Sequence, residues 1–249
     1  GSRLTEAVMV SSIGSYSTAQ TGNAVAFKAA SAPELVSDAS KNQGASGTQG
    51  GGTLTISTLA SQLADSASRA EARDKMLSRS ELADKANSLL DQILGDAYQA
   101  NKAKYNNEVP KTDDPELLAR AKQATEFVTS SDRGSRSVKN PFGSLSREQL
   151  SNIIYDDSGN YTINERRAAY YESDDREQAW RVKVAAQAMD EYNRTGKMTN
   201  FFSSVLDHFK ELPTIEQAQY PKDYASDLES KISRDFNYRT HQAEGKSEN

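Results

Sequence analysis

The longest helical pattern in the sequence is INERRAAYYESDDREQAWRVKVAAQAMDEYNRTG, residues 163–196. In its second half, apolar side chains recur every four residues, at Trp180, Val184, Ala188 and Tyr192. This spacing places them on one face of a helix. Gly196 follows the pattern and is expected to terminate the helix in a left-handed conformation. The polar residues 173–175 predict an interruption, after which Asp174 and Glu177 would cap a second segment.

Shorter helices are predicted on both sides of this stretch by their start signals. Three pairs have the spacing of a capping box: Ser78 with Glu81, Ser146 with Gln149, and Thr162 with Glu165. Asp114 precedes a proline and a glutamate, which is typical of the first turn of a helix. Further helices are expected over residues 199–212 and 222–238. The sequence therefore predicts an all-α protein.

Composition divides the helical part at a polar, glycine-containing stretch, residues 129–140, which we interpret as a linker. Of the 19 aromatic residues, 14 lie between Phe142 and Tyr238, and large aromatic side chains dominate the energetics of a core. We therefore expect a compact, irregular bundle of four to six helices over residues 141–240. Residues 53–128 form a second helical segment, in which two amphipathic patterns predict a helical hairpin.

The N-terminal region differs in amino-acid composition from the helical part. Gly1 and Ser2 suggest that residues 1–8 remain from an expression vector, before a native start at Met9. Eight of the 14 glycines lie at or before Gly52, and such Gly- and Ser-rich composition predicts disorder over residues 9–52. The polar residues 241–249 are expected to be a disordered tail.

The beginning of this region, from Met9, resembles the uncleaved N-terminal signals of bacterial type III or flagellar-type secretion substrates, because it is rich in serine and poor in acidic residues. The resemblance implies a bacterial protein that is either cytoplasmic or exported without a cleavable signal peptide. The alternative is an ordinary flexible tail.

Charge and cysteine content exclude several classes of function. Thirty Lys and Arg residues are interspersed with 35 Asp and Glu residues, for a net charge of −5, so no basic patch for nucleic acid is expected. The chain has no cysteine, which excludes disulfides and zinc–thiolate sites. No apolar run approaches the roughly 18 residues of a transmembrane segment.

The stretch YDDSGNYTINER, residues 155–166, contains the best candidate for a metal site. Counted from Asp156, oxygen donors occupy the positions of calcium ligands in an EF-hand loop: Asp156, Ser158, Asn160, Thr162 through its carbonyl, and Asn164. Residues 146–170 thus resemble a degenerate EF-hand helix-loop-helix, which implies calcium. Tyr161 replaces the usual glycine and Arg167 replaces the bidentate acid. The alternative is a structural turn, since Thr162 and Glu165 are also a capping pair.

No reaction class is indicated by the remaining residues. His208 lies beside Phe209 in an amphipathic pattern and is expected at the edge of a core, and no complete phosphate-binding loop is present. Whether the protein is an enzyme stays undecided, with a non-enzymatic role favoured. We expect a helical bacterial protein that binds a protein partner. It is either secreted or retained in the cytoplasm. The alternatives are a calcium-responsive protein and an effector enzyme with an unrecognised site.

Overall fold

The computed structural model describes residues 57–245. The regions predicted to be an expression remnant and a disordered N-terminal segment, residues 1–8 and 9–52, lie outside the described part of the chain. Within it, the all-α prediction is confirmed: helices dominate, and the strands form one two-residue pair. The elements are α3 (Thr58–Met76), α4 (Arg79–Leu94), α5 (Asp96–Ala100), α6 (Lys102–Asn106), α7 (Pro115–Asp132), α8 (Arg147–Ile154), α9 (Ile163–Thr195), α10 (Thr199–Lys210), α11 (Thr214–Gln217), α12 (Tyr224–Arg234), β1 (Phe236–Asn237) and β2 (Gln242–Ala243).

The predicted helix starts are confirmed at atomic level. All three capping boxes form, at the beginnings of α4, α8 and α9. The Asp114 side chain accepts hydrogen bonds from the backbone N–H groups of Glu116 and Leu117 at the start of α7. Gly196 ends α9 with a φ of 76°, which glycine adopts without steric cost. These features depend on residues within one turn, so the sequence alone specifies them.

The predicted interruption of the long helix at residues 173–175 is wrong, because α9 runs without a break from Ile163 to Thr195. Arg176 pairs with Glu172 one turn earlier at 2.9 Å, and Arg181 lies 3.9 Å from Glu177. Such pairs, four residues apart, stabilise a continuous helix. Ser173, at the predicted interruption, is completely buried in the continuous helix.

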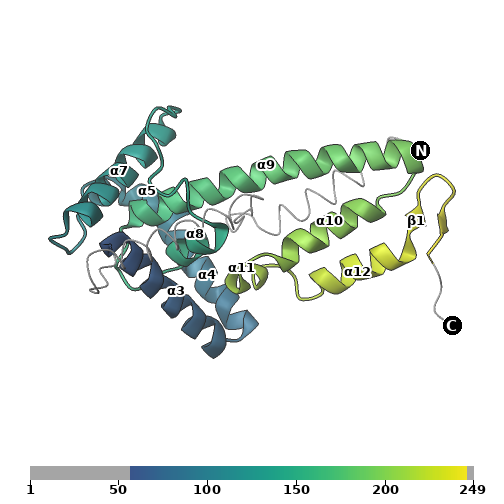
Figure 1. Ribbon diagram of the computed structural model, residues 1–249, viewed down its shortest axis with the longest axis horizontal. Coiled ribbons are helices and arrows are strands. Elements are labelled where there is room, and N and C mark those ends of the chain that lie inside the picture. The colour runs from purple at the N-terminus through teal and green to yellow at the C-terminus, as the bar shows by residue number, and fades with distance from the viewer. Residues whose placement is uncertain (1–56, 246–249) are drawn as a thin grey trace, which may run out of the picture.

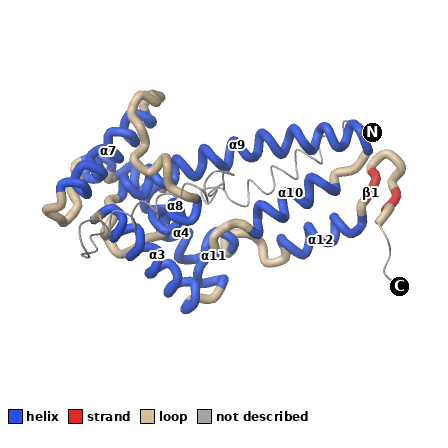
Figure 2. The backbone as a smooth tube through the Cα atoms, in the orientation of Figure 1, coloured by secondary structure: helices blue, strands red, loops and turns tan. Residues whose placement is uncertain are grey.

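Two hydrophobic clusters share α9. The first contains side chains of α4, α7, α8 and the first part of α9, whereas the second contains side chains of the second part of α9, α10 and α12. In Figure 1, α10 and α12 lie beside the far half of α9, and the other long helices gather around its beginning. Figure 2 shows the same division with loops distinguished from helices. The clusters therefore divide within α9. The predicted linker at residues 129–140 overlaps the last turn of α7, and its remainder lies between α7 and α8, two helices of the first cluster.

The predicted hairpin helices each pack mainly on other elements. α3 and α4 are separated only by residues 77 and 78, but α3 packs on α8 and α7, and α4 packs on α9 and α11. The amphipathic pattern identified the buried face of α4. In α3 the buried residues are Ala60, Ser66 and Ala70, and of the expected stripe of Leu59, Leu63, Ala67 and Ala70 only Ala70 is fully buried. The patterns carried no information on which distant helix would cover each face.

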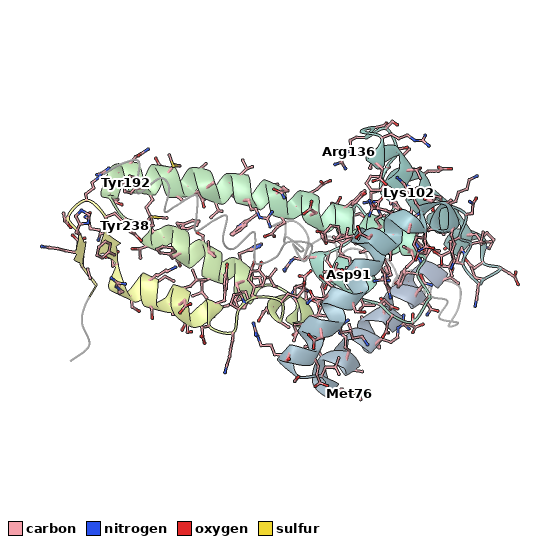
Figure 3. The ribbon with its side chains drawn as sticks, turned by 180° about the vertical axis from the view of Figure 1, so that it is seen from behind. Met76, Asp91, Lys102, Arg136, Tyr192 and Tyr238 are labelled. Carbon is pink, nitrogen blue, oxygen red and sulfur yellow. The ribbon has the colours of Figure 1, made fainter. Side chains whose placement is uncertain are left out.

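The C-terminal end differs from prediction in two ways. α12 ends at Arg234 rather than Tyr238, and Asp235 adopts a φ of 46°. Residues 236–237 then pair with 242–243, part of the expected disordered tail. Lys197 holds this end in place through ion pairs with Asp235 at 2.8 Å and Glu244 at 2.6 Å. Figure 3 shows Tyr192 and Tyr238 together at this end, far from Met76 at the end of α3.

Candidate functional site

A hollow of about 500 Å³ lies where three segments distant in sequence meet. Its walls are residues 58–65 at the start of α3, residues 108–112 between α6 and α7, and residues 158–162 before α9. We call it the loop groove. Its volume lies in the range of ligand sites in proteins. The groove includes part of the EF-hand-like segment. The hydrogen bonds that the predicted calcium ligands make therefore determine what the groove can bind.

The loop at the groove is organised by Asp156. One carboxylate oxygen, Oδ1, accepts hydrogen bonds from the backbone N–H and the hydroxyl of Ser158, at 2.8 and 2.5 Å. The other, Oδ2, accepts a bond of 2.7 Å from Arg69 of α3. The Ser158 hydroxyl in turn accepts a bond of 3.2 Å from the Asn160 backbone. Aspartates and serines commonly form such local turns, so these side chains act here as turn formers.

The other two predicted ligands are engaged elsewhere. Thr162 and Glu165 form the capping box of α9, with bonds of 3.0 and 3.1 Å. Asn164 is completely buried; its carboxamide oxygen accepts a bond of 2.7 Å from the Tyr98 hydroxyl, and its nitrogen donates to Asn106 at 3.0 Å. The side chains of Asp156, Ser158 and Asn164 are therefore all engaged in hydrogen bonds within the protein. Over residues 57–245, no three His, Asp or Glu side chains are grouped as a metal site would need.

Both departures from the EF-hand pattern have structural roles. Tyr161 is buried, and its hydroxyl donates toward Ser66 of α3 at 3.2 Å, while burial raises its pKa to about 12. Arg167 lies 4.1 Å above the Tyr98 ring, and it donates to the carbonyl oxygen of Ile93 at the end of α4. A cation at the C-terminal end of a helix is favourable. These residues therefore anchor α9 to α3, α4 and α5.

The rim of the groove carries residues that sequence reasoning missed. Glu108 accepts a hydrogen bond of 2.9 Å from the Ile163 backbone N–H, so it satisfies one of the free donors at the start of α9. Val109 next to it is 68% exposed, unusually high for a large apolar side chain. Asp65 and Lys111 lie exposed on the groove walls. No local motif connects these residues, because long-range packing alone brings them together.

A second cavity lies between α9 and α10. His208 is buried, its Nε2 lies 2.9 Å from Glu177 Oε2, and its ring stacks on Trp180 with centroids 3.8 Å apart. His208 was expected at the edge of a core. It is buried, and the Glu177 carboxylate is its partner. The cavity beside it measures about 20 Å³, enough for one water molecule. Tyr220 also lines it, and burial raises its pKa.

Neither known protein families nor curated proteins nor solved structures include a match to this chain. Over the described helices, none has the length and apolar character needed to cross a membrane. A functional interpretation therefore depends on the geometry of the loop groove and of the cavity at His208.

Proposed function

We propose that this protein is a non-enzymatic binding protein that holds an extended segment of a partner protein in the loop groove. The observation that supports this proposal is the groove itself, about 500 Å³ in volume and open beside the exposed Val109. The cavity at His208 is too small for a peptide side chain. Of the two cavities, the groove is therefore the one with room for a polypeptide.

The walls of the groove are held in place before any partner binds. The ion pair of Arg69 with Asp156 fixes the 158–162 loop to α3, and Glu108 fixes the 108–112 segment to the start of α9. A preformed site avoids part of the entropic cost of ordering loops on binding. This favours a function in recognition over one in which the loop only connects α8 to α9.

The chemistry of the walls indicates what kind of segment would fit. Val109 offers an apolar contact, and the carboxylates of Asp65 and Glu108 outnumber the one ammonium group, that of Lys111. An extended chain presents alternate side chains to opposite sides. A segment in which apolar and basic residues alternate would therefore place apolar groups against Val109 and cationic groups near the carboxylates.

Fluorescence anisotropy with labelled hexapeptides tests this proposal. We expect a peptide of alternating valine and lysine to bind more tightly than one of alternating valine and glutamate. Val109→Ser should weaken binding about tenfold, equivalent to a loss of 1.4 kcal/mol. The matched control is Val182→Ser, because Val182 is 73% exposed on α9 outside the groove. Equal affinities of these two variants, or a preference for the acidic peptide, would contradict the proposal.

We also propose that the protein is exported by a bacterial secretion apparatus, on the basis of the Ser-rich sequence from Met9. Residues 9–52, outside the described part, would carry the signal. Fused to a reporter, they should direct its secretion from a bacterium that has a type III or flagellar-type system. The control is the same strain without that apparatus. Equal secretion from both strains would reject export by this route.

A further inference from the structure

The second half of α9 carries a second apolar face, on the side of the helix away from its core contacts. The core contacts are made by Val184 and Ala188, which belong to the second hydrophobic cluster. On the other side, apolar residues recur at alternating spacings of three and four, which places them in one row along the helix. We call this row the outer stripe; it consists of Ala179, Val182, Ala186 and Met189.

The outer stripe is largely exposed although it is apolar. Val182 is 73% exposed, and Ala179 and Ala186 are exposed as well. Met189 is partly buried, because it also packs against the second hydrophobic cluster. In Figure 1 this half of α9 forms an edge of the described structure, with α10 and α12 on one side of it. Single apolar side chains are common on protein surfaces, but a row of them on one helix face is typical of an interaction site.

We infer that the outer stripe binds the outer stripe of a second copy of this chain, with the two α9 helices antiparallel. Its spacing of three, four and three residues is that of the apolar positions in a coiled coil. The small side chains of Ala179 and Ala186 let two helices approach closely, since the distance between packed helices depends on the side chains at the contact. A symmetric dimer uses the same patch on both copies, so one exposed stripe is enough.

The charges beside the outer stripe are complementary to those of a second copy. Lys183 and Asp190 are both exposed and lie seven residues apart, which places them along the same flank of the stripe. A two-fold axis midway between them sets Lys183 of each copy opposite Asp190 of the partner subunit, which forms two ion pairs. In a parallel dimer this flank would instead face the other flank, where Gln178 and Ala185 lie. The charges therefore favour the antiparallel arrangement.

The existing partner of Asp190 is compatible with this interface. Asp190 lies 3.0 Å from Arg194, and the two side chains are 65% and 66% exposed. Exposed pairs of this kind contribute little to stability, so the carboxylate is able to share a second cation. The outer stripe is only about 15 Å long, at the helical rise per residue. Such a small interface is typical of weak, reversible association, and we expect a dissociation constant in the micromolar range.

Sedimentation velocity of the full-length chain, over a range of protein concentrations, measures this dissociation constant. We expect Val182→Ser to raise it about tenfold, because each copy loses an apolar side chain that the dimer buries. Met76→Ser is the matched control, since Met76 is 80% exposed at the end of α3, outside the outer stripe. A chain that stays monomeric into the submillimolar range overturns the inference, as does an equal effect of the two substitutions.

Charge reversal tests the antiparallel arrangement. Lys183→Glu sets two carboxylates opposite each other at both ion pairs and should weaken the dimer about tenfold at low salt. The combination of Lys183→Glu with Asp190→Lys makes the charges opposite again and should return the dissociation constant to near its original value. Lys75→Glu changes the net charge equally at a 73% exposed side chain on α3 and should have no effect.

The three charge variants decide the outcome together, with circular dichroism to verify that each keeps the helix content of the unaltered protein. Failure of the double reversal to restore association overturns the antiparallel pairing of α9. Equal weakening by Lys75→Glu and Lys183→Glu overturns it too, because association would then depend on net charge alone. The inference concerns α9 and does not depend on the loop groove, whose walls lie outside the outer stripe.

Discussion

The Nε atom of Arg120 lies 2.6 Å from the Glu165 carboxylate, although the two side chains are only 8% and 1% exposed. Glu165 also closes the capping box with Thr162, so one carboxylate joins α7 to the first turn of α9. The guanidinium carbon of Arg120 lies 5.0 Å from the centroid of the Tyr161 ring. This pair therefore supports the loop that forms one wall of the groove.

Removing one member of this pair should be costly. Arg120→Met leaves the Glu165 carboxylate buried without its cationic partner, and we expect the free energy of unfolding to fall by about 3 kcal/mol. Urea denaturation at pH 7 measures it. Combining Arg120→Met with Glu165→Gln should cost less than the sum of the single changes, because glutamine still closes a capping box and no charge remains unpaired.

The exposed pair of Arg136 and Asp175 provides the control for that experiment. Its partners are 63% and 51% exposed and lie 3.3 Å apart. Arg136→Met should change the free energy of unfolding by less than about 1 kcal/mol, since water screens exposed ion pairs. If Arg120→Met and Arg136→Met lowered the free energy of unfolding equally, burial would not determine the strength of the pair of Arg120 with Glu165.

The features of the fold that were predicted correctly from the sequence depend on residues close together in the chain. The capping boxes at Ser78, Ser146 and Thr162 formed as predicted because each needs only residues three positions apart. The interruption of α9 was predicted by the same local reasoning and was wrong. The ion pairs along the helix surface, which a cap signal does not include, favour the continuous helix.

The candidate groove could not be predicted for a related reason. Its walls come from three segments, residues 58–65, 108–112 and 158–162. Only the last drew attention, through a resemblance to calcium-binding loops. The contact of Glu108 with the backbone of Ile163 spans 55 positions, and no spacing rule applies at that separation. Composition likewise located the aromatic residues without indicating that α9 carries two separate clusters.

Limited proteolysis should divide the chain before the described helices. Residues 9–52 are predicted to bury too little apolar surface to offset the entropy of an ordered chain. We expect a protease to remove them first and to leave a resistant helical fragment that begins near residue 53, identified by mass spectrometry. Protection of residues 10–30 at protease levels that cut other exposed sites would contradict this prediction.

Asp174 should influence stability through pH. Burial raises its pKa, against the opposing effect of Arg181. A carboxyl group whose pKa is higher in the folded state destabilises the fold once it is ionised, and this effect disappears below the unfolded pKa of about 3.8. Asp174→Asn should therefore raise the free energy of unfolding at pH 7, with a gain that shrinks as the pH falls.

The neighbouring aspartate provides a matched control for this effect. Asp175 is exposed on the same helix, so Asp175→Asn should change the free energy of unfolding by no more than about 0.5 kcal/mol. Thermal unfolding of both variants from pH 4 to pH 8 gives the comparison. A loss of stability in the Asp174 variant at pH 7 would mean that its ionised form is favoured by the fold.

Thr162 and Asp156 distinguish a structural turn from a calcium site. As a turn, the loop depends on capping, so Thr162→Ala should lower the free energy of unfolding by about 1 kcal/mol, with or without calcium. Calcium should leave the melting temperature of the unaltered protein unchanged, because Arg69 pairs with Asp156, and Tyr98 and Asn106 engage Asn164. As a metal site, the loop would instead bind calcium only when folded, and the melting temperature would rise with calcium concentration. Micromolar calcium affinity by calorimetry that is lost in Asp156→Ala would establish a metal site there in place of the turn.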